Sequence, residues 1–149
     1  MVLIKNKLQK IKLNTKKLQK HAEKILKALK YDDFDIGILI TTNKTIQKFN
    51  QKFRSKNKPT DILSFPYHTK LKPGKKITPN KEDDRNLGDI IISPEFILKE
   101  NQKQSLEKKL NILLAHGIAH LLGYNHKTQK SYVEMQKFEK KLLKIIDKN

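Results

Sequence analysis

The sequence contains no cysteine among its 149 residues, which excludes a disulfide framework, a thiolate metal site and a cysteine nucleophile. No apolar run approaches the roughly 18 residues of a membrane span, so no transmembrane helix is expected. Residues 1–5 hold a short apolar stretch with lysine after it rather than before it, which is not the pattern of a secretory signal peptide. These absences predict a cytoplasmic protein without a membrane partner.

Arginine is also scarce. Only two of the 33 basic residues are arginine, Arg54 and Arg85, and the net charge is +18. Two interpretations of this charge stay open. Many lysines can simply be solvated surface in a chain of biased composition, or the charge attracts a polyanion by neutralising its phosphates. Where such a chain keeps arginine, the planar guanidinium with its paired donors is expected to be needed.

Apolar residues are numerous enough for one core. Leu, Ile, Val and Phe number 44, about 30 % of the chain, which exceeds the roughly 20 % below which a highly charged chain is expected to be disordered. The length fits one domain, and we expect it to span residues 1–149.

The apolar pattern predicts strands interleaved with helices. Strands are expected at residues 2–5, 34–40, 62–65 and 87–92. Helices are expected at residues 16–30, after a cap at Thr42 or Asn43, from 94 to about 100, after a cap at Ser105, and from 128 to 146. The polar residues 67–86 are expected to form a mobile excursion or a loose hairpin arm. The fold class is therefore predicted to be α+β, a small mixed sheet with helices packed on it.

Three of the five histidines fall within eleven residues. His116 and His120 are four apart on a predicted helix, so both imidazoles lie on one face and can reach one ion. Gly123 is expected to end that helix and to let the chain reverse, which returns His126 to the same point. Three imidazoles with an open fourth position are typical of catalytic zinc, which can activate a bound water at neutral pH.

The familiar zinc-peptidase motif has a glutamate directly after its first histidine, as general base. This chain has Gly117 there, and no carboxylate lies between His116 and His120. The pattern therefore argues against a peptidase. We also expect Gly117 to leave free space beside the metal for a bulky substrate group.

The motif and two earlier segments resemble one known family. The residues that carry the resemblance are His116-Gly117-x-x-His120-Leu121-x-Gly123-Tyr124-x-His126, then Asn50 with Phe53-Arg54 and Lys56, then Lys58-Pro59-Thr60-Asp61-Ile62-Leu63-Ser64-Phe65-Pro66, and Leu87-Gly88-Asp89-Ile90. Together they are similar to the YbeY family of bacterial rRNA maturation factors and metal-dependent endoribonucleases. In one departure, Asn125 stands where the family usually has aspartate, which removes a charged neighbour of the last histidine.

The resemblance implies a four-stranded mixed sheet with a central histidine-bearing helix. It implies cleavage of single-stranded RNA, in 16S rRNA 3′-end maturation and ribosome quality control. The implied metal ligands are His116, His120 and His126, holding one Zn²⁺ or another divalent ion. These histidines and Arg54 form the expected catalytic set, with Arg54 stabilising charge in the transition state. The implied partners are ribosomal RNA and proteins of the small ribosomal subunit or its assembly.

Other functions and residues stay open at this point. The alternatives to a nuclease are a non-catalytic ribosome-assembly factor with a structural metal and a hydrolase acting on another substrate, such as a peptide. His68 is a possible lining residue of the site, and Tyr124 either stacks on a base or packs at the helix end. Asp61 and Asp89 are expected to be structural. Lysines are expected to follow the RNA backbone, namely Lys52, Lys56 and Lys58.

Overall fold

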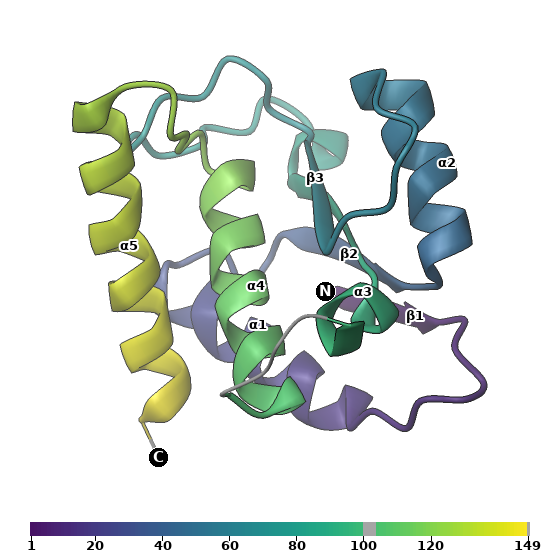
Figure 1. The fold of residues 1–149 in the computed structure, drawn as a ribbon. Coiled ribbons are helices and arrows are strands. Elements are labelled where there is room, and N and C mark those ends of the chain that lie inside the picture. The colour runs from purple at the N-terminus through teal and green to yellow at the C-terminus, as the bar shows by residue number, and fades with distance from the viewer. Residues whose placement is uncertain (100–103, 149) are drawn as a thin grey trace.

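The computed structural model describes residues 1–99 and 104–148 of the chain (Figure 1). The strands are β1 (Val2–Asn6), β2 (Asp35–Ile40), β3 (Ile62–Pro66) and β4 (Asn86–Ile92). The helices are α1 (Thr15–Ala28), α2 (Asn43–Arg54), α3 (Pro94–Lys99), α4 (Leu106–Leu121) and α5 (Gln129–Asp147), with one 3₁₀ turn, η1 (Glu82–Asp84). Each predicted strand and helix is confirmed within a few residues. The predicted end of the short helix, residue 100, lies outside the described residues.

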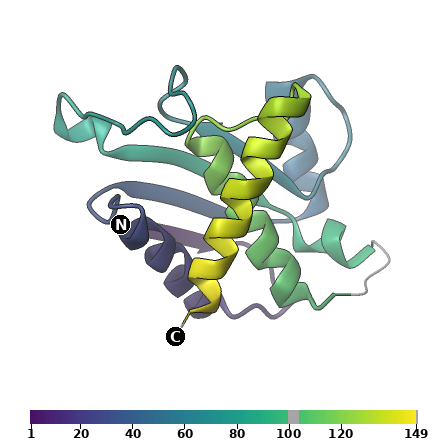
Figure 2. The same ribbon diagram turned by 90° about the vertical axis from the view of Figure 1, so that its left-hand side faces the viewer.

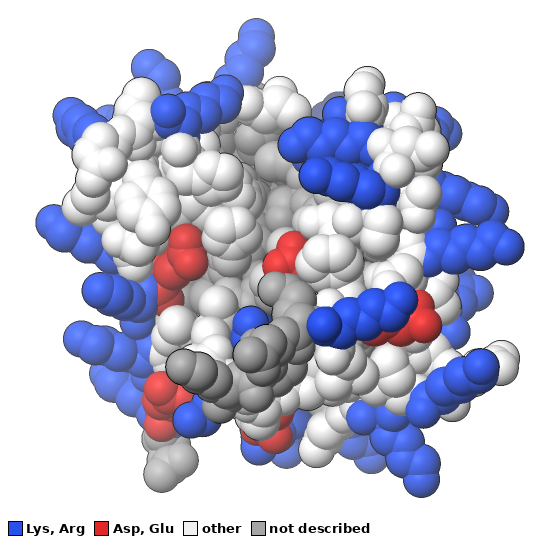
Figure 3. Space-filling view, viewed as in Figure 1, with Lys and Arg blue, Asp and Glu red and all other residues white. Residues whose placement is uncertain are grey.

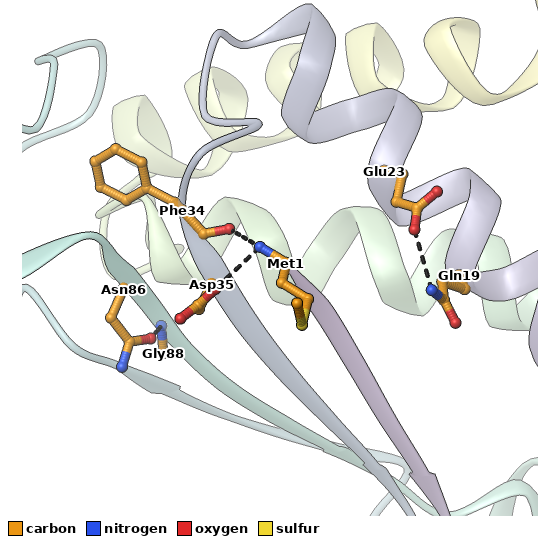
Figure 4. Close-up of polar contacts among 7 residues, drawn as sticks. All are labelled: Met1, Gln19, Glu23, Phe34, Asp35, Asn86 and Gly88. Atoms are coloured by element: carbon orange, nitrogen blue, oxygen red, sulfur yellow. Dashed lines mark hydrogen bonds and ion pairs between the residues drawn. The ribbon is translucent and has the colours of Figure 1, made fainter. Parts of the chain in front are cut away.

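The four strands form one mixed sheet in the order β1-β2-β4-β3. β1, β2 and β4 run parallel, and β3 runs antiparallel to β4 at the edge, with Phe65 opposite Asp89. β1 is also held at its start, because the amino group of Met1 contacts the carbonyl oxygen of Phe34 and, at 3.0 Å, the carboxylate of Asp35 (Figure 4). The predicted α+β class is confirmed.

Helices cover the two faces of the sheet unequally (Figures 1 and 2). The larger core lies between the sheet and α1, α4 and α5, and it includes Ile36, Ile38 and Ile40 of β2. On the other face α2 contributes Ile46, which packs with Leu63 and Ile91. Alternation along the strands sends successive side chains to opposite faces, so the isoleucines at even positions of β2 all enter the larger core.

Helix α4 occupies the centre of the larger core, as expected. Leu114, Ala115, Ile118, Ala119 and Leu121 are fully buried. Ser105 caps the helix by accepting a hydrogen bond from the backbone of Lys108, which satisfies one of the free amides of the first turn. No helix of the described residues has the length and apolar composition needed to cross a membrane.

Residues 67–86 do not form a loose hairpin arm. The turn η1 is the regular structure of residues 67–85, Asn86 already belongs to β4, and Ile77 anchors the segment in the larger core with 6 % of its surface exposed. The backbone amide of Ile77 donates to the hydroxyl of Tyr31 at 3.0 Å. Isolated apolar residues such as Leu71 and Ile77 in a polar segment carry no periodic signal, and for that reason the sequence pattern did not reveal this anchor.

Candidate metal centre and cleft

Three histidines converge at the end of α4. His116 and His120 lie one turn apart on the helix, and the chain reverses at Gly123, which has φ +95°. His126 then returns, so that one ring nitrogen from each histidine lies within 4.8 Å of the others. The three side chains form a group that could hold a metal ion, as their spacing predicts.

Neighbouring oxygens fix how two of the rings are oriented. Nδ1 of His116 lies 3.3 Å from a carboxylate oxygen of Glu139 on α5, and Nδ1 of His120 lies 3.0 Å from the carbonyl oxygen of Tyr124. Because both oxygens accept hydrogen bonds, the proton of each neutral ring belongs on Nδ1. The Nε2 lone pairs are then free to bind a metal.

The two Nε2 atoms face each other at 3.1 Å. Two lone pairs at this distance repel unless a cation lies between them or beside them. The distance is close to the roughly 3.3 Å between two ligands that bind one zinc at about 2.0–2.1 Å with tetrahedral angles. The donor set therefore fits a divalent metal bound through imidazole nitrogens.

The surroundings also keep His120 neutral. The pKa of His120 is lowered from 6.5 to about 4, mainly by burial and then by the neighbouring His116 and His126, against opposing effects of the Tyr124 carbonyl and Glu139. A neutral imidazole is the form that binds metal. His120 is thus ready to act as a ligand at neutral pH.

Glycine at two positions of this segment has different roles. A Cβ on Gly123 would lie 2.3 Å from the carbonyl oxygen of Leu71, and its positive φ disfavours any side chain. A Cβ on Gly117 would lie 2.8 Å from Cδ1 of Ile90 in β4. The expectation that Gly117 opens space beside the metal is therefore wrong. This glycine faces the sheet and lets α4 approach it closely.

The histidines lie in a cleft of 770 Å³ between β3, the end of α2 and the turn after α4. Figure 3 shows this face of the molecule hollowed, with lysine and arginine side chains on the α2 side of the hollow. The basic residues that line the cleft are Arg54, Lys56, Lys58 and Lys127. Among the described residues Asp61 is the only carboxylate in the lining. The cleft therefore favours an anionic ligand.

Arg54 is the last residue of α2 and is exposed at the cleft. Its Nη2 donates to the carbonyl oxygen of Ser64 in β3 at 2.9 Å, and its Nη1 donates at 3.4 Å to the carbonyl oxygen of Phe53. The remaining N–H donors of the guanidinium stay available. The other arginine, Arg85, forms an ion pair with Asp33 and so has a structural partner. Only one of the two arginines lines the metal cleft.

A buried amide holds the segment that follows α2. The side chain of Asn50 is 3 % exposed and donates to the carbonyl oxygen of Lys58 at 2.8 Å. This bond ties residues 55–61 to α2. It explains why an asparagine is buried inside the helix one turn after Ile46.

Several other sequence candidates have defined surroundings. His68 lines the cleft, but its Nε2 lies 2.8 Å from the carbonyl oxygen of Asp84 and it is not part of the histidine group. Tyr124 packs at the helix end, because its ring stacks on Phe138 with centroids 4.3 Å apart. Asn125 lines the cleft and accepts a hydrogen bond from the backbone of Lys127.

The remaining candidates are the half-buried Asp61 of the cleft lining and two exposed residues, Asp89 and Lys52. Asp61 accepts a hydrogen bond from the hydroxyl of Thr60, and Asp89 lies over Gly37, on the face of the sheet that α2 leaves partly open. Lys52 does not line the cleft, and its Nζ lies 5.2 Å from the ring centroid of Phe53.

Glu139 was not among the site residues predicted from the sequence. The signal was present, because Glu139 follows Met135 by four residues and precedes Leu142 by three. These two residues are buried, so helical spacing brings this carboxylate to the edge of the buried face of α5. A carboxylate at such a position needs a partner, and its partner is His116.

Comparison with known proteins gives one consistent result. A family model described as Endoribonuclease YbeY matches residues 3–147. The human protein named Endoribonuclease YbeY is 36 % identical over 143 residues, which cover 95 % of this chain and 86 % of that protein. The Aquifex aeolicus protein of the same name is 37 % identical over 134 residues, covering 89 % and 81 % of the two chains.

The fold agrees with a solved structure. The solution structure of TM1509 from Thermotoga maritima aligns with a TM-score of 0.56 and 25 % sequence identity. The alignment covers 97 % of this chain and 90 % of that chain. The similarity therefore includes the whole sheet together with the helices around it.

Proposed function

The chain belongs to the YbeY family, and on that premise we propose that it is a metal-dependent endoribonuclease that cleaves single-stranded RNA. One observation carries the proposal: the Nε2 atoms of His116 and His120 converge with His126 in a cleft whose lining is basic. A ligand with closely spaced negative charges and a reaction that needs a cation both suit such a cleft. Residues 1–149 would act as one domain.

The metal in this proposal is one Zn²⁺ held by His116, His120 and His126. When bound, such an ion supplies a Lewis acid that activates a water or polarises a phosphate oxygen. Among the described residues no fourth histidine or carboxylate joins the group, which supports an open coordination position. A position open to substrate or water favours a catalytic centre over a structural one.

Arg54 is the proposed catalytic residue on the α2 side of the cleft. In phosphodiester cleavage negative charge grows on the non-bridging oxygens of the scissile phosphate. The free donors of the Arg54 guanidinium can bond two of these oxygens together, and such bonds strengthen as the charge grows. Lys56, Lys58 and Lys127 would hold the neighbouring phosphates as screened point charges.

The biological substrate in this proposal is ribosomal RNA. The family resemblance supports action in 16S rRNA 3′-end maturation and in ribosome quality control, with proteins of the small subunit or its assembly as partners. It also supports a cytoplasmic location. The alternative is a non-catalytic ribosome-assembly factor with a structural metal.

The test is cleavage of an end-labelled single-stranded RNA by the purified protein. We expect cleavage that stops on chelation and returns when Zn²⁺ is added back, and no cleavage by His120→Ala. The matched control is His21→Gln, since His21 lies outside the cleft and pairs with Asn111. Cleavage by His120→Ala at the wild-type rate would contradict the proposal, because the activity would then not depend on the histidine group. A folded, zinc-loaded protein without cleavage would favour the assembly factor.

A further inference from the structure

Three phenylalanines form a connected cluster beside the metal cleft. Phe49 and Phe53 on α2 stack with ring centroids 6.2 Å apart. Phe53 also meets Phe65 on β3 edge to face, with centroids 5.3 Å apart. The cluster thus joins the end of α2 to the edge strand of the sheet.

Phe53 remains exposed despite these contacts. It keeps 49 % of its surface accessible, whereas Phe49 and Phe65 are half-buried. The sheet beside Phe65 is also uncovered. Asp89, the cross-strand partner of Phe65, is exposed, and its neighbour Gly37 has no side chain. A flat ligand therefore has access to Phe53 from the open part of the sheet face.

Basic groups surround this aromatic surface. The guanidinium carbon of Arg54 lies 5.1 Å from the ring centroid of Phe65, and Nζ of Lys52 lies 5.2 Å from that of Phe53. Arg54 also lines the metal cleft. One residue therefore borders both the cleft and the cluster.

We propose that Phe53 and Phe65 form a subsite that stacks a nucleobase of a single-stranded nucleic acid whose backbone lies in the metal cleft. The proposal rests on the proposed function for the path of the strand. Proteins that bind single strands combine a basic groove with exposed aromatic rings, because every base offers a flat face to stack on. Here the groove and the ring are adjacent, and Arg54 joins them.

The opposing explanation is that Phe53 only packs against Phe65 and stabilises the end of α2. Phe53→Leu separates the two explanations, because leucine keeps an apolar contact with Phe65 and removes the flat ring. Phe53→Tyr keeps the ring. The matched control is Tyr132→Leu, which removes an aromatic side chain of similar exposure, 45 %, from α5.

The experiment measures binding of two fluorescein-labelled decamers by stopped-flow anisotropy, within seconds of mixing with the zinc-loaded protein. One decamer is single-stranded RNA, and the other has the same ribose–phosphate backbone without bases. We expect wild type, Phe53→Tyr and Tyr132→Leu to bind the RNA about tenfold more tightly than the abasic strand. Phe53→Leu is expected to bind both strands with the affinity that wild type has for the abasic one.

Each other outcome has a definite meaning. If Phe53→Leu still prefers the strand with bases as strongly as wild type does, the subsite is wrong, and the exposed cluster serves packing or a protein partner. Cleavage of the same RNA, followed on gels, tests the proposed function separately. If the wild-type protein prefers the strand with bases through Phe53 but does not cleave RNA, the stacking subsite is supported and the proposed nuclease function is wrong. If the wild-type protein cleaves RNA but does not prefer the strand with bases, the nuclease function is supported and the stacking subsite is wrong.

Discussion

The Nδ1 atom of His116 lies 3.3 Å from a carboxylate oxygen of Glu139, so a residue of α5 orients a candidate metal ligand on α4. Both side chains are mostly buried, with 28 % and 21 % exposed. This contact makes the packing of α5 on α4 part of the metal centre. A carboxylate in this place fixes the ring and makes its free nitrogen a stronger ligand.

Loss of this carboxylate should weaken metal binding. We expect Glu139→Ala to lower zinc affinity by about tenfold to a hundredfold, and Glu139→Gln to lower it less because the amide oxygen still accepts from Nδ1. Competition with a chromophoric chelator measures the affinity. Glu134→Ala, an exposed carboxylate of the same helix, is the control. Equal affinities for all four proteins would show that Glu139 does not support the site.

The turn after α4 should tolerate no side chain. Gly123→Ala combines a positive φ with a Cβ that overlaps the Leu71 carbonyl oxygen, whereas Gly74→Ala has a positive φ of 79° and nothing within 4 Å. We expect Gly74→Ala to cost about 1 kcal/mol and Gly123→Ala at least about 2 kcal/mol. Urea unfolding gives both values. A smaller loss for Gly123→Ala than for Gly74→Ala would contradict the packing of residues 67–86 on this turn.

Asn50 should support both stability and the cleft. Asn50→Ala leaves the carbonyl oxygen of Lys58 without its buried donor, so we expect a loss of about 1–3 kcal/mol in the free energy of unfolding. RNA cleavage should also fall, while zinc affinity stays unchanged. Asn57→Ala removes an exposed bond to Gln47 and should change stability by less than about 0.5 kcal/mol. If Asn50→Ala instead lowers zinc affinity, the substitution disturbs the histidine group, and the prediction is wrong.

The metal-free protein should lose stability in mild acid. His120 has a folded-state pKa of about 4, below its ordinary value of 6.5. Between these two pH values His120 is protonated in the unfolded chain and stays neutral in the folded chain. The free energy of unfolding therefore falls as the pH falls. Urea unfolding with chelator present, at pH 7, 5.5 and 4.5, measures this decline. His120→Gln should show a smaller decline in the free energy of unfolding over this pH range. A decline as large as that of wild type would show that other groups cause it.

The sequence alone predicted the elements well because their signals are local. Apolar spacing, Ser105 as a cap and a glycine after α4 each act within a few residues. The convergence of His116, His120 and His126 was predictable for the same reason, since one helical turn and one reversal bring them together.

Contacts between distant segments were not predictable in this way. Glu139 contacts His116, which lies 23 residues away in the sequence. The backbone amide of Ile77 donates to the hydroxyl of Tyr31, which lies 46 residues away. Gly117 was misread because the direction of its Cβ depends on which face of α4 packs on β4. These relationships follow from how helices pack on the sheet, and no local pattern encodes that packing.

Metal binding and Arg54 are expected to contribute separately to RNA cleavage. Zinc content and cleavage of single-stranded RNA, measured on the same preparations of wild type, Arg54→Ala and His120→Ala, test this expectation most directly. We expect one zinc and cleavage for wild type, one zinc with cleavage reduced by at least about a hundredfold for Arg54→Ala, and loss of both for His120→Ala. Full cleavage by zinc-loaded Arg54→Ala, or by zinc-free His120→Ala, would contradict it.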